Sequence, residues 1–366
     1  MKCLKNLAMN SNSEYNQYKA QYINKDIVAK STLLENIKIT DKDVLIVENQ
    51  PIVANRNTIE LIESIAGLTP TQKKYIKKYG GEADAIMIEN YFNTTKSNAD
   101  NQNVLLIADT KSQCIANALI LKEDIIPYKL SFEFLEHIIN KFDFEVDSIL
   151  PIDISFIESG FYIYLIHNSI YDFIEGESFR FGLVITVCLN KIEINLLYHR
   201  NSCGNLSISK VSDNFCSIYS LTPENWIKAI SNIEFIIKKG FSIDNFEEKI
   251  KEAISTKASF YEIESLDRKF RSCLHQKKHL KIFDYPLLKN KFHDAIADIG
   301  DNKNHYFFKR NCQTKYNIWD IYNKATYFAT HEKGIDNDKR KILQNEAHLF
   351  LMKNKYDLKA PFRIKI

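Results

Sequence analysis

The chain has 366 residues, of which 45% are hydrophobic and 26% are charged. These values exclude a disordered, collagen-like or coiled-coil protein, and the length allows two ordinary domains or one large one. The sequence holds only 10 Gly and 7 Pro, where average usage would give roughly 26 and 18. The chain therefore has few glycines from which phosphate-binding loops could be built, and this disfavours the common nucleotide-binding folds.

The first part of the chain predicts two regions. Residues 1–40 are rich in Asn, Ser, Gln and Lys, which indicates a polar, partly disordered segment with order beginning near Asp43. Residues 41–150 predict an α/β accessory region. Its expected elements are a strand at Asp43–Glu48, helices at Asn57–Ala66 and from Thr69 to a left-handed stop at Gly80-Gly81, an exposed loop at Asn93–Asn103, a strand at Asn103–Ala108 and a helix capped by Ser131 that ends at Phe142.

Residues 151–240 have the most regular pattern of β-rich runs, and we predict that they form the central domain, a sheet with a covering helix. Four β-rich runs are separated by short polar or Gly-bearing links, so their strands are expected to be antiparallel neighbours. The runs are Phe161–His167, Phe181–Leu189, Ile192–His199 and Leu206–Val211. Thr222-Pro223-Glu224 then predicts the start of a helix that ends at Gly240 and covers the sheet with Trp226 and Ile233.

Residues 241–366 predict a basic and mostly helical region. The expected helices begin at a capping box of Asp244 and Glu247, run from Ser265 through Leu280, from Thr314 to Glu332, and from Asp336 to Asn354. The whole pattern predicts an α+β fold, with a central antiparallel β-meander covered by helices and a mostly helical basic C-terminal region.

Charge is distributed unevenly along the chain. Residues 266–366 hold 22 Lys and Arg against 11 Asp and Glu, a net charge of +11, whereas the preceding residues have a net charge of −8. A basic region of this kind can bind phosphates, or it can dock on the acidic part of its own chain. The candidate nucleic-acid-binding residues are Arg268, Lys269, Arg271, Lys277, Lys278, Lys281, Lys309, Arg310 and Trp319.

Catalytic and metal signatures are weak. The chain contains no P-loop, G-x-G-x-x-G, G-x-S-x-G or H-E-x-x-H motif, and we predict no cofactor. Cys273, His275 and His279 form a weak metal candidate, because the spacing of the two histidines places them on one helix face. The alternative is a solvated basic helix with incidental histidines. A second set, His199, Cys203 and Cys216, lacks a fourth ligand.

The expected location is the cytoplasm. The seven cysteines are odd in number and never arranged as C-x-x-C, which is typical of reduced thiols. No N-terminal run has the length of a signal peptide, and the most apolar stretches are too short for a membrane span. If a phage encodes the chain, the compartment is the cytoplasm of its host.

Two stretches resemble a family of phage- and plasmid-borne proteins that carry a domain of unknown function. The first spans residues 182–208, where two strands lead to a turn with Arg200, Asn201, Cys203, Gly204 and Asn205. The second spans residues 318–331, a helix built on Trp319, Asn323 and Thr326. The resemblance implies a mobile-element protein that acts in replication, recombination or counter-defence.

The leading hypothesis is a nucleic-acid-binding protein without enzymatic activity. The order of a meander, a covering helix and a basic helical tail resembles phage single-strand annealing proteins, which need no ATP and work as multimers. We therefore expect a homo-oligomer that binds single-stranded DNA and is not bound to a membrane. The alternatives are a protein–protein module that inhibits or scaffolds a host or phage partner, and a metal-dependent hydrolase.

Overall fold

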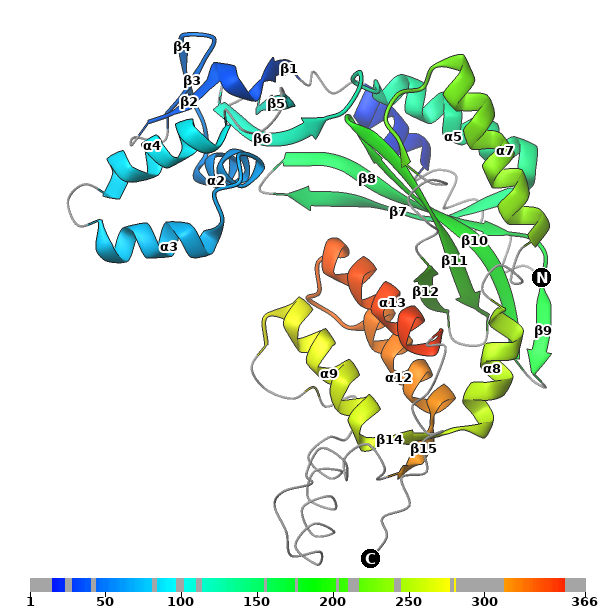
Figure 1. Cartoon of the computed structure of the whole chain (residues 1–366). Helices are drawn as coiled ribbons and strands as arrows, with labels where there is room; N and C mark the ends of the chain where they lie inside the picture. Colours follow the sequence, from blue (N-terminus) through cyan, green and yellow to red (C-terminus); the bar gives the residue numbers. More distant parts are fainter. Residues whose placement is uncertain are drawn as a thin grey trace, which may run out of the picture.

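A computed structural model describes most of the chain (Figure 1). The described residues are 15–23, 28–40, 44–80, 84–96, 102–109, 114–154, 157–174, 177–201, 204–209, 217–239, 245–276, 280 and 313–352. The fold is α+β, as predicted, and a curled antiparallel sheet lies at its centre.

The central sheet has seven strands. Five follow one another in the order β12-β11-β10-β8-β7, while β13 pairs with β11 and β9 pairs with β10. The strands are β7 (Phe144–Ile154), β8 (Ile157–His167), β9 (Tyr171–Ile174), β10 (Glu177–Cys188), β11 (Lys191–Arg200), β12 (Asn205–Ser209) and β13 (Ser217–Ile218). The four predicted strands are confirmed as antiparallel neighbours, and β7 extends the sheet beyond them.

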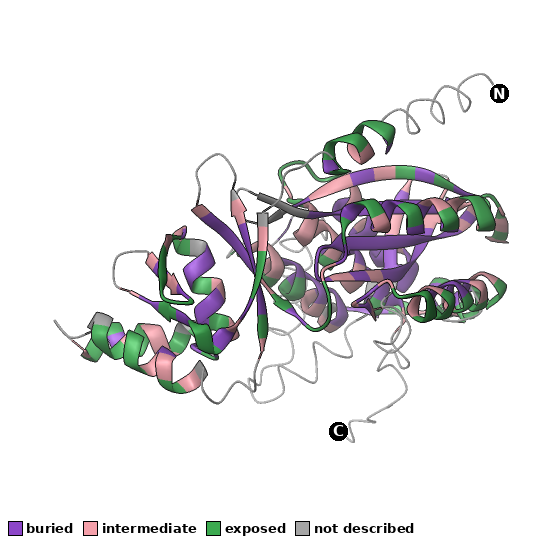
Figure 2. Ribbon diagram, turned by 90° about the horizontal axis from the view of Figure 1, so that it is seen from above, coloured by how far each residue is buried: buried purple, intermediate pink, exposed green. Residues whose placement is uncertain are grey.

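Both faces of this sheet are buried, because apolar residues occupy both sides of β10. Leu183 and Ile185 point into the largest core cluster, whereas Val184 and Cys188 belong to a smaller cluster on the opposite face. Figure 2 shows the central strands buried along most of their length, while the covering helices keep exposed outer faces. Gly182 allows β8 to approach β10, since a Cβ there would lie 2.0 Å from the Leu165 carbonyl oxygen.

Two helices cover the outer side of the curl: α5 (Tyr128–Phe142) and α7 (Pro223–Lys239) (Figure 1). The predicted covering role of α7 is confirmed, because Ile230 and Ile233 are buried in the main core and Trp226 packs edge-on against Phe134, with ring centroids 5.1 Å apart. The helix predicted at Ser131 begins earlier, at Tyr128. Ser131 is buried inside it, and Pro127 occupies the N-cap position.

The C-terminal part packs along the β12 edge of the sheet, and its helices contribute buried residues to the main core (Figure 1). It comprises α8 (Phe246–Ser255), β14 (Lys257–Ser259), α9 (Phe260–Leu274), β15 (Gln313–Asn317), α12 (Ile318–His331) and α13 (Asn337–Leu351). Arg340 holds α12 and α13 together, because its guanidinium donates to the carbonyl oxygens of Ala329, Thr330 and Glu332 at the end of α12.

Three predicted helix starts in this part are wrong. The helix expected from Ser265 begins at Phe260, where Ser259 and Glu262 form a capping box. The helix expected from Thr314 begins at Ile318, because residues 313–317 pair with β14 instead. The N-cap of α8 is Asn245, one residue after the predicted Asp244, which lies outside the described residues. Asn245 has a left-handed conformation and makes no side-chain cap.

Residues 28–121 form a module beside the sheet (Figure 1). It has a core cluster of its own, while Leu105, Ile107 and Leu121 join it to the main core. One of its two three-stranded sheets has the order β1-β5-β6 and the other β2-β3-β4. Its elements are β1 (Val28–Leu33), η1 (Leu34–Asn36), β2 (Ile37–Ile39), β3 (Val44–Val47), β4 (Gln50–Val53), α2 (Arg56–Ile65), α3 (Pro70–Tyr79), α4 (Asp84–Lys96), β5 (Asn103–Asp109) and β6 (Cys114–Leu121).

The structure corrects the predicted beginning of order near Asp43. A helix over residues 15–23 places Tyr15 and Tyr22 in the main core, and the Tyr22 hydroxyl donates to the Gly160 carbonyl oxygen at 2.7 Å. The strands β1 and β2 also precede Asp43. The predicted region boundary near residue 150 falls inside β7, which pairs with β8.

Two further predictions in the module differ from the structure. Residues 93–96 of the expected loop are the last residues of α4. The capped start of α3 is confirmed, since Thr69 and Gln72 form a capping box with Pro70 at the first helical position. Gly80 ends this helix with a right-handed backbone (φ −79°), so the predicted left-handed stop is wrong for this residue.

Asp336 caps α13 and makes the stability of the protein depend on pH. Its carboxylate accepts from the Lys339 amide at 2.8 Å and pairs with the Lys339 ammonium at 2.6 Å. Burial opposes ionisation, but these hydrogen bonds outweigh it, so the pKa of Asp336 lies below its usual value. Because the folded-state pKa is lowered, the ionised carboxylate stabilises the fold at pH values above its unfolded-state pKa of about 3.9. This stabilisation is lost as the pH falls through the folded-state pKa.

We expect Asp336→Ala to lower the free energy of unfolding by about 1 kcal/mol at neutral pH. Urea unfolding at a series of pH values should show the difference from wild type shrinking below pH ~4. Asp336→Asn is the control, because it keeps the cap acceptor without the charge and should be less destabilised. A difference that stays constant down to pH ~2 would contradict this role for the carboxylate.

Candidate functional site

The predicted basic residues on α9 are largely neutralised. Arg271 pairs with Asp267 at 2.8 Å, Lys269 pairs with Glu346 of α13, and Arg268 lies 3.7 Å from Glu264. The helix holds three acidic and three basic residues, so its net charge is zero. The other predicted cations, Lys277, Lys278, Lys281, Lys309 and Arg310, lie outside the described residues.

Trp319 is buried, with 7% of its surface exposed. Its ring stacks on Tyr322 with centroids 5.1 Å apart, and the guanidinium of Arg200 lies 5.7 Å from its centroid. A ring held in this way is not presented to a nucleotide base. We therefore leave Trp319 out of the candidate nucleic-acid surface.

The turn that carries the family resemblance is held by internal contacts. Arg200 pairs with Glu177 through two nitrogens, and Asn201 bonds Ser178 through both its backbone and its side chain. Gly204 has a positive φ of 64°, which glycine adopts without strain. Cys203 lies outside the described residues. The described part of the turn therefore acts as a structural connection between β11 and β12.

The two stretches that carry the resemblance contact each other. Ser207 of β12 and Tyr322 of α12 share a hydrogen bond of 2.8 Å between their hydroxyls. The Leu206 amide donates to the Thr330 hydroxyl at 3.1 Å, and the Asn205 amide group donates to Thr326 at 3.4 Å. Residues more than 100 positions apart thus form one packing unit.

The metal candidates are not brought together within the described part of the chain. Cys273 is half-buried near the end of α9, and His275 is the C-cap of that helix; His279 lies outside the described residues. His199 bonds Asn201, while Cys203 and Cys216 are also outside. Among the residues that the structure describes, no group of three His, Cys, Asp or Glu side chains could hold a metal ion.

The most basic helix that the structure describes is α3, which the sequence reasoning did not single out. It carries Lys73, Lys74, Lys77 and Lys78 and no acidic residue. Lys73 pairs with the buried Glu63, but no described carboxylate pairs with the other three, which are exposed. The same helix exposes two large aromatic side chains, Tyr75 and Tyr79. The sequence KKYIKKY at residues 73–79 contains these lysines and tyrosines, but a net charge summed over a long region does not reveal such a short basic segment.

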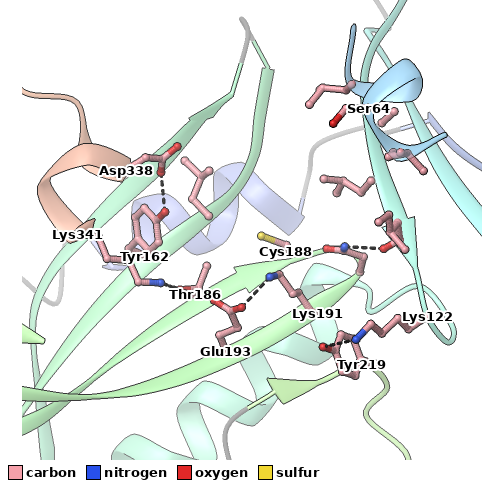
Figure 3. Close-up of a pocket in the computed structure, with 17 residues that line it drawn as sticks. Ser64, Lys122, Tyr162, Thr186, Cys188, Lys191, Glu193, Tyr219, Asp338 and Lys341 are labelled. Carbon is pink, nitrogen blue, oxygen red and sulfur yellow. Dashed lines mark hydrogen bonds and ion pairs between the residues drawn. The ribbon is translucent and has the colours of Figure 1, made fainter. Parts of the chain in front are cut away.

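A cleft of about 550 Å³ lies between the module and the central sheet (Figure 3). Ser64 and Ile65 of α2 and Ile120 of β6 line one wall, and Tyr162 and Cys188 of the sheet line the other. Three lysines and two carboxylates also line it: Lys122, Lys191, Lys341, Glu193 and Asp338. The cleft therefore combines apolar walls with a small excess of positive charge.

The charged groups of the cleft are connected to one another (Figure 3). Lys341 Nζ donates to the Thr186 hydroxyl at 2.6 Å and lies 3.7 Å from Glu193, which also pairs with Lys191 at 2.7 Å. The Tyr162 hydroxyl donates to Asp338 at 2.6 Å. Burial, and then this hydrogen bond, raises the pKa of Tyr162, so the phenol stays protonated.

The cleft lining holds no activated cysteine among its described residues. Cys188 is buried, and burial raises the pKa of its thiol to about 12, because the low dielectric disfavours the thiolate. With Tyr162 also protonated, the described lining is suited to binding through lysine charges and apolar contacts. Neither Cys188 nor Tyr162 presents an ionised nucleophile to the cleft.

No protein-family model, curated protein or solved structure matches this chain. Among the described helices, none combines the length and the apolar character needed to cross a bilayer.

We expect iodoacetamide at pH 8 to leave Cys188 unmodified in the native protein. A thiol with a pKa of about 12 holds on the order of a thousandfold less thiolate than an ordinary one at this pH. Peptide mass spectrometry of native and urea-unfolded samples measures the difference, with the half-buried Cys114 as the internal comparison. Equal labelling rates of the two cysteines in the native state would show that Cys188 is more accessible than its burial indicates.

Proposed function

We propose that this protein binds single-stranded nucleic acid without using ATP, through the exposed face of α3. The observation that carries the proposal is the local charge of this helix, four lysines and no carboxylate in ten residues. The phage or mobile-element setting, the action in replication or recombination and the homo-oligomeric state belong to the same proposal. They are supported by the sequence resemblance described above.

The side chains of α3 are arranged in a way that suits binding of single-stranded nucleic acid. Successive helix positions turn by about 100°, so Lys74, Lys77 and Lys78 lie on one side and Tyr75 and Tyr79 on the adjoining side. The two tyrosine rings have centroids 4.6 Å apart and are 66% and 64% exposed. Ammonium groups neutralise phosphates, and exposed aromatic rings stack on unpaired bases.

The exposed face of α3 is separate from what holds the helix in place. Ile76 is buried beneath it, Gln72 bonds the hydroxyl of Tyr91 on α4, and Lys73 pairs with Glu63 of α2. Because Tyr75 and Tyr79 are largely exposed, they contribute little to the core and are available to a binding partner. The lysine and tyrosine side chains can be changed while these anchors remain.

A protein partner is the second candidate. The neighbouring helix α4 exposes Ile86 (61%) and Met87 (46%), and exposed apolar side chains next to aromatic ones are typical of protein interfaces. This observation favours the protein–protein module over the metal-dependent hydrolase. Nucleic acid remains the first proposal, because three exposed lysines without an acidic partner among the described residues would be unfavourable at the core of a protein interface.

We expect the triple variant Lys74→Gln/Lys77→Gln/Lys78→Gln to bind oligo-dT more weakly and with less dependence on salt. Each phosphate that is no longer neutralised lowers the slope of log K against log salt by about 0.7, so three of them lower it by about 2. Fluorescence anisotropy across a salt series measures both the affinity and the slope. The matched control replaces Lys129, Lys228 and Lys238, which are exposed on α5 and α7. An unchanged slope in the α3 variant, or an equal decrease in the control, would contradict the proposed surface.

The contribution of Tyr75 and Tyr79 to binding should not depend on the salt concentration. We expect Tyr75→Ala/Tyr79→Ala to weaken binding to oligo-dT at least about fivefold, because a stacked base contributes about 1–3 kcal/mol. The salt slope should stay at the wild-type value. Tyr75→Phe/Tyr79→Phe is the control, since it keeps the rings and should bind like wild type. If the alanine variant binds as tightly as wild type, the rings do not stack on bases and the contact is with phosphates alone.

A further inference from the structure

We infer that the cleft between the module and the central sheet is a binding site for an amphipathic carboxylic acid that carries a hydrogen-bond donor. This site is separate from the face of α3 and does not rest on the proposed nucleic-acid function. Three features of the lining carry the inference: its apolar walls, its charge and one unpaired acceptor.

The apolar walls come from both parts of the protein. Ile65 of α2 and Ile120 of β6 line the cleft from the module, and Ile152 and Cys188 line it from the central sheet. Ile120 is 41% exposed although it lies in a strand whose other residues are largely buried. A cleft of about 550 Å³ is in the usual range of small-molecule sites, which bury an apolar ligand body and orient it by a few polar groups.

The charge of the lining favours an anion. Glu193 is shared between Lys191 and Lys341, and Asp338 is engaged by the Tyr162 hydroxyl. Lys122 is exposed and donates to the Tyr219 hydroxyl at 3.0 Å. With three ammonium groups and two carboxylates, the lining has a net charge of +1, so a ligand with one acidic group would neutralise it.

Asn190 supplies the third feature. Its side chain is buried, with 8% exposed, and its amide nitrogen donates to the Ile120 carbonyl oxygen at 2.8 Å. Its carbonyl oxygen has no hydrogen-bond donor within the described structure. An acceptor buried without a partner is costly, and an N–H or O–H group on a ligand in the cleft would satisfy it.

N-octanoylglycine is a suitable probe, because it combines an alkyl chain, an amide N–H and one carboxylate. We expect isothermal titration calorimetry of the full chain to show one site. Two matched ligands separate the features: the methyl ester removes the charge, and N-octanoylsarcosine replaces the N–H by a methyl group. Each should bind at least about fivefold more weakly than the acid. No binding of the acid, or an ester that binds as tightly, would overturn the inference.

Two variants of the module wall test the location. Ile120→Trp on β6 and Ser64→Trp on α2 each place a bulky ring in the cleft, and each should abolish binding of N-octanoylglycine. Two variants are used because thermal unfolding will show whether either one fails to fold. Lys122→Ala should weaken binding about threefold by removing an exposed charge, whereas Lys129→Ala on α5 should not. If both folded tryptophan variants bind like wild type, the ligand lies elsewhere and the inference is wrong.

Discussion

The central sheet is apolar on both faces, and this constraint determines the arrangement of the rest of the chain. A sheet with one polar face could leave that face in water, but here Val184 and Cys188 on the inner side need cover as much as Leu183 and Ile185 on the outer side. The helices α5 and α7 cover the outer side. The buried residues of α8, α12 and α13 join the same core cluster as Leu183 and Ile185, and Phe246 of α8 stacks on Tyr198 of β11. On the inner side, Asp338 and Lys341 at the start of α13 contact the sheet, and the cleft lies between them and the module.

Packing between distant segments gives the C-terminal helices their position. The hairpin of β11 and β12 is anchored on α12 through Ser207 and Tyr322, and Arg340 then fixes α13 to the end of α12. Through these contacts α13 delivers Asp338 and Lys341 to the inner face of the sheet. The charged cluster in the cleft therefore depends on contacts made well away from it.

Local patterns were sufficient for the central strands and for α7, since each has its own apolar periodicity and end signals. They failed where pairing is distant in sequence. Residues 313–317 read as helix but pair with β14, which lies far back in the sequence. The strand β7 was missed for a different reason: its partner β8 follows directly, but Asp147, Pro151 and Asp153 interrupt the apolar pattern of β7. The pairing of Lys269 on α9 could not be predicted either, because its partner Glu346 lies 77 residues away on α13.

The helix over residues 15–23 belongs to the main core, and the module that follows is joined to the same core, because Leu105 and Ile107 of β5 and Leu121 of β6 are buried there. The module is an insertion with two covalent connections to the body of the protein. Because β5 and β6 are also packed into the main core, any rotation of the module would have to separate these buried side chains from it. Such a rotation would change the separation of Ile120 from the sheet and would carry α3 along with it.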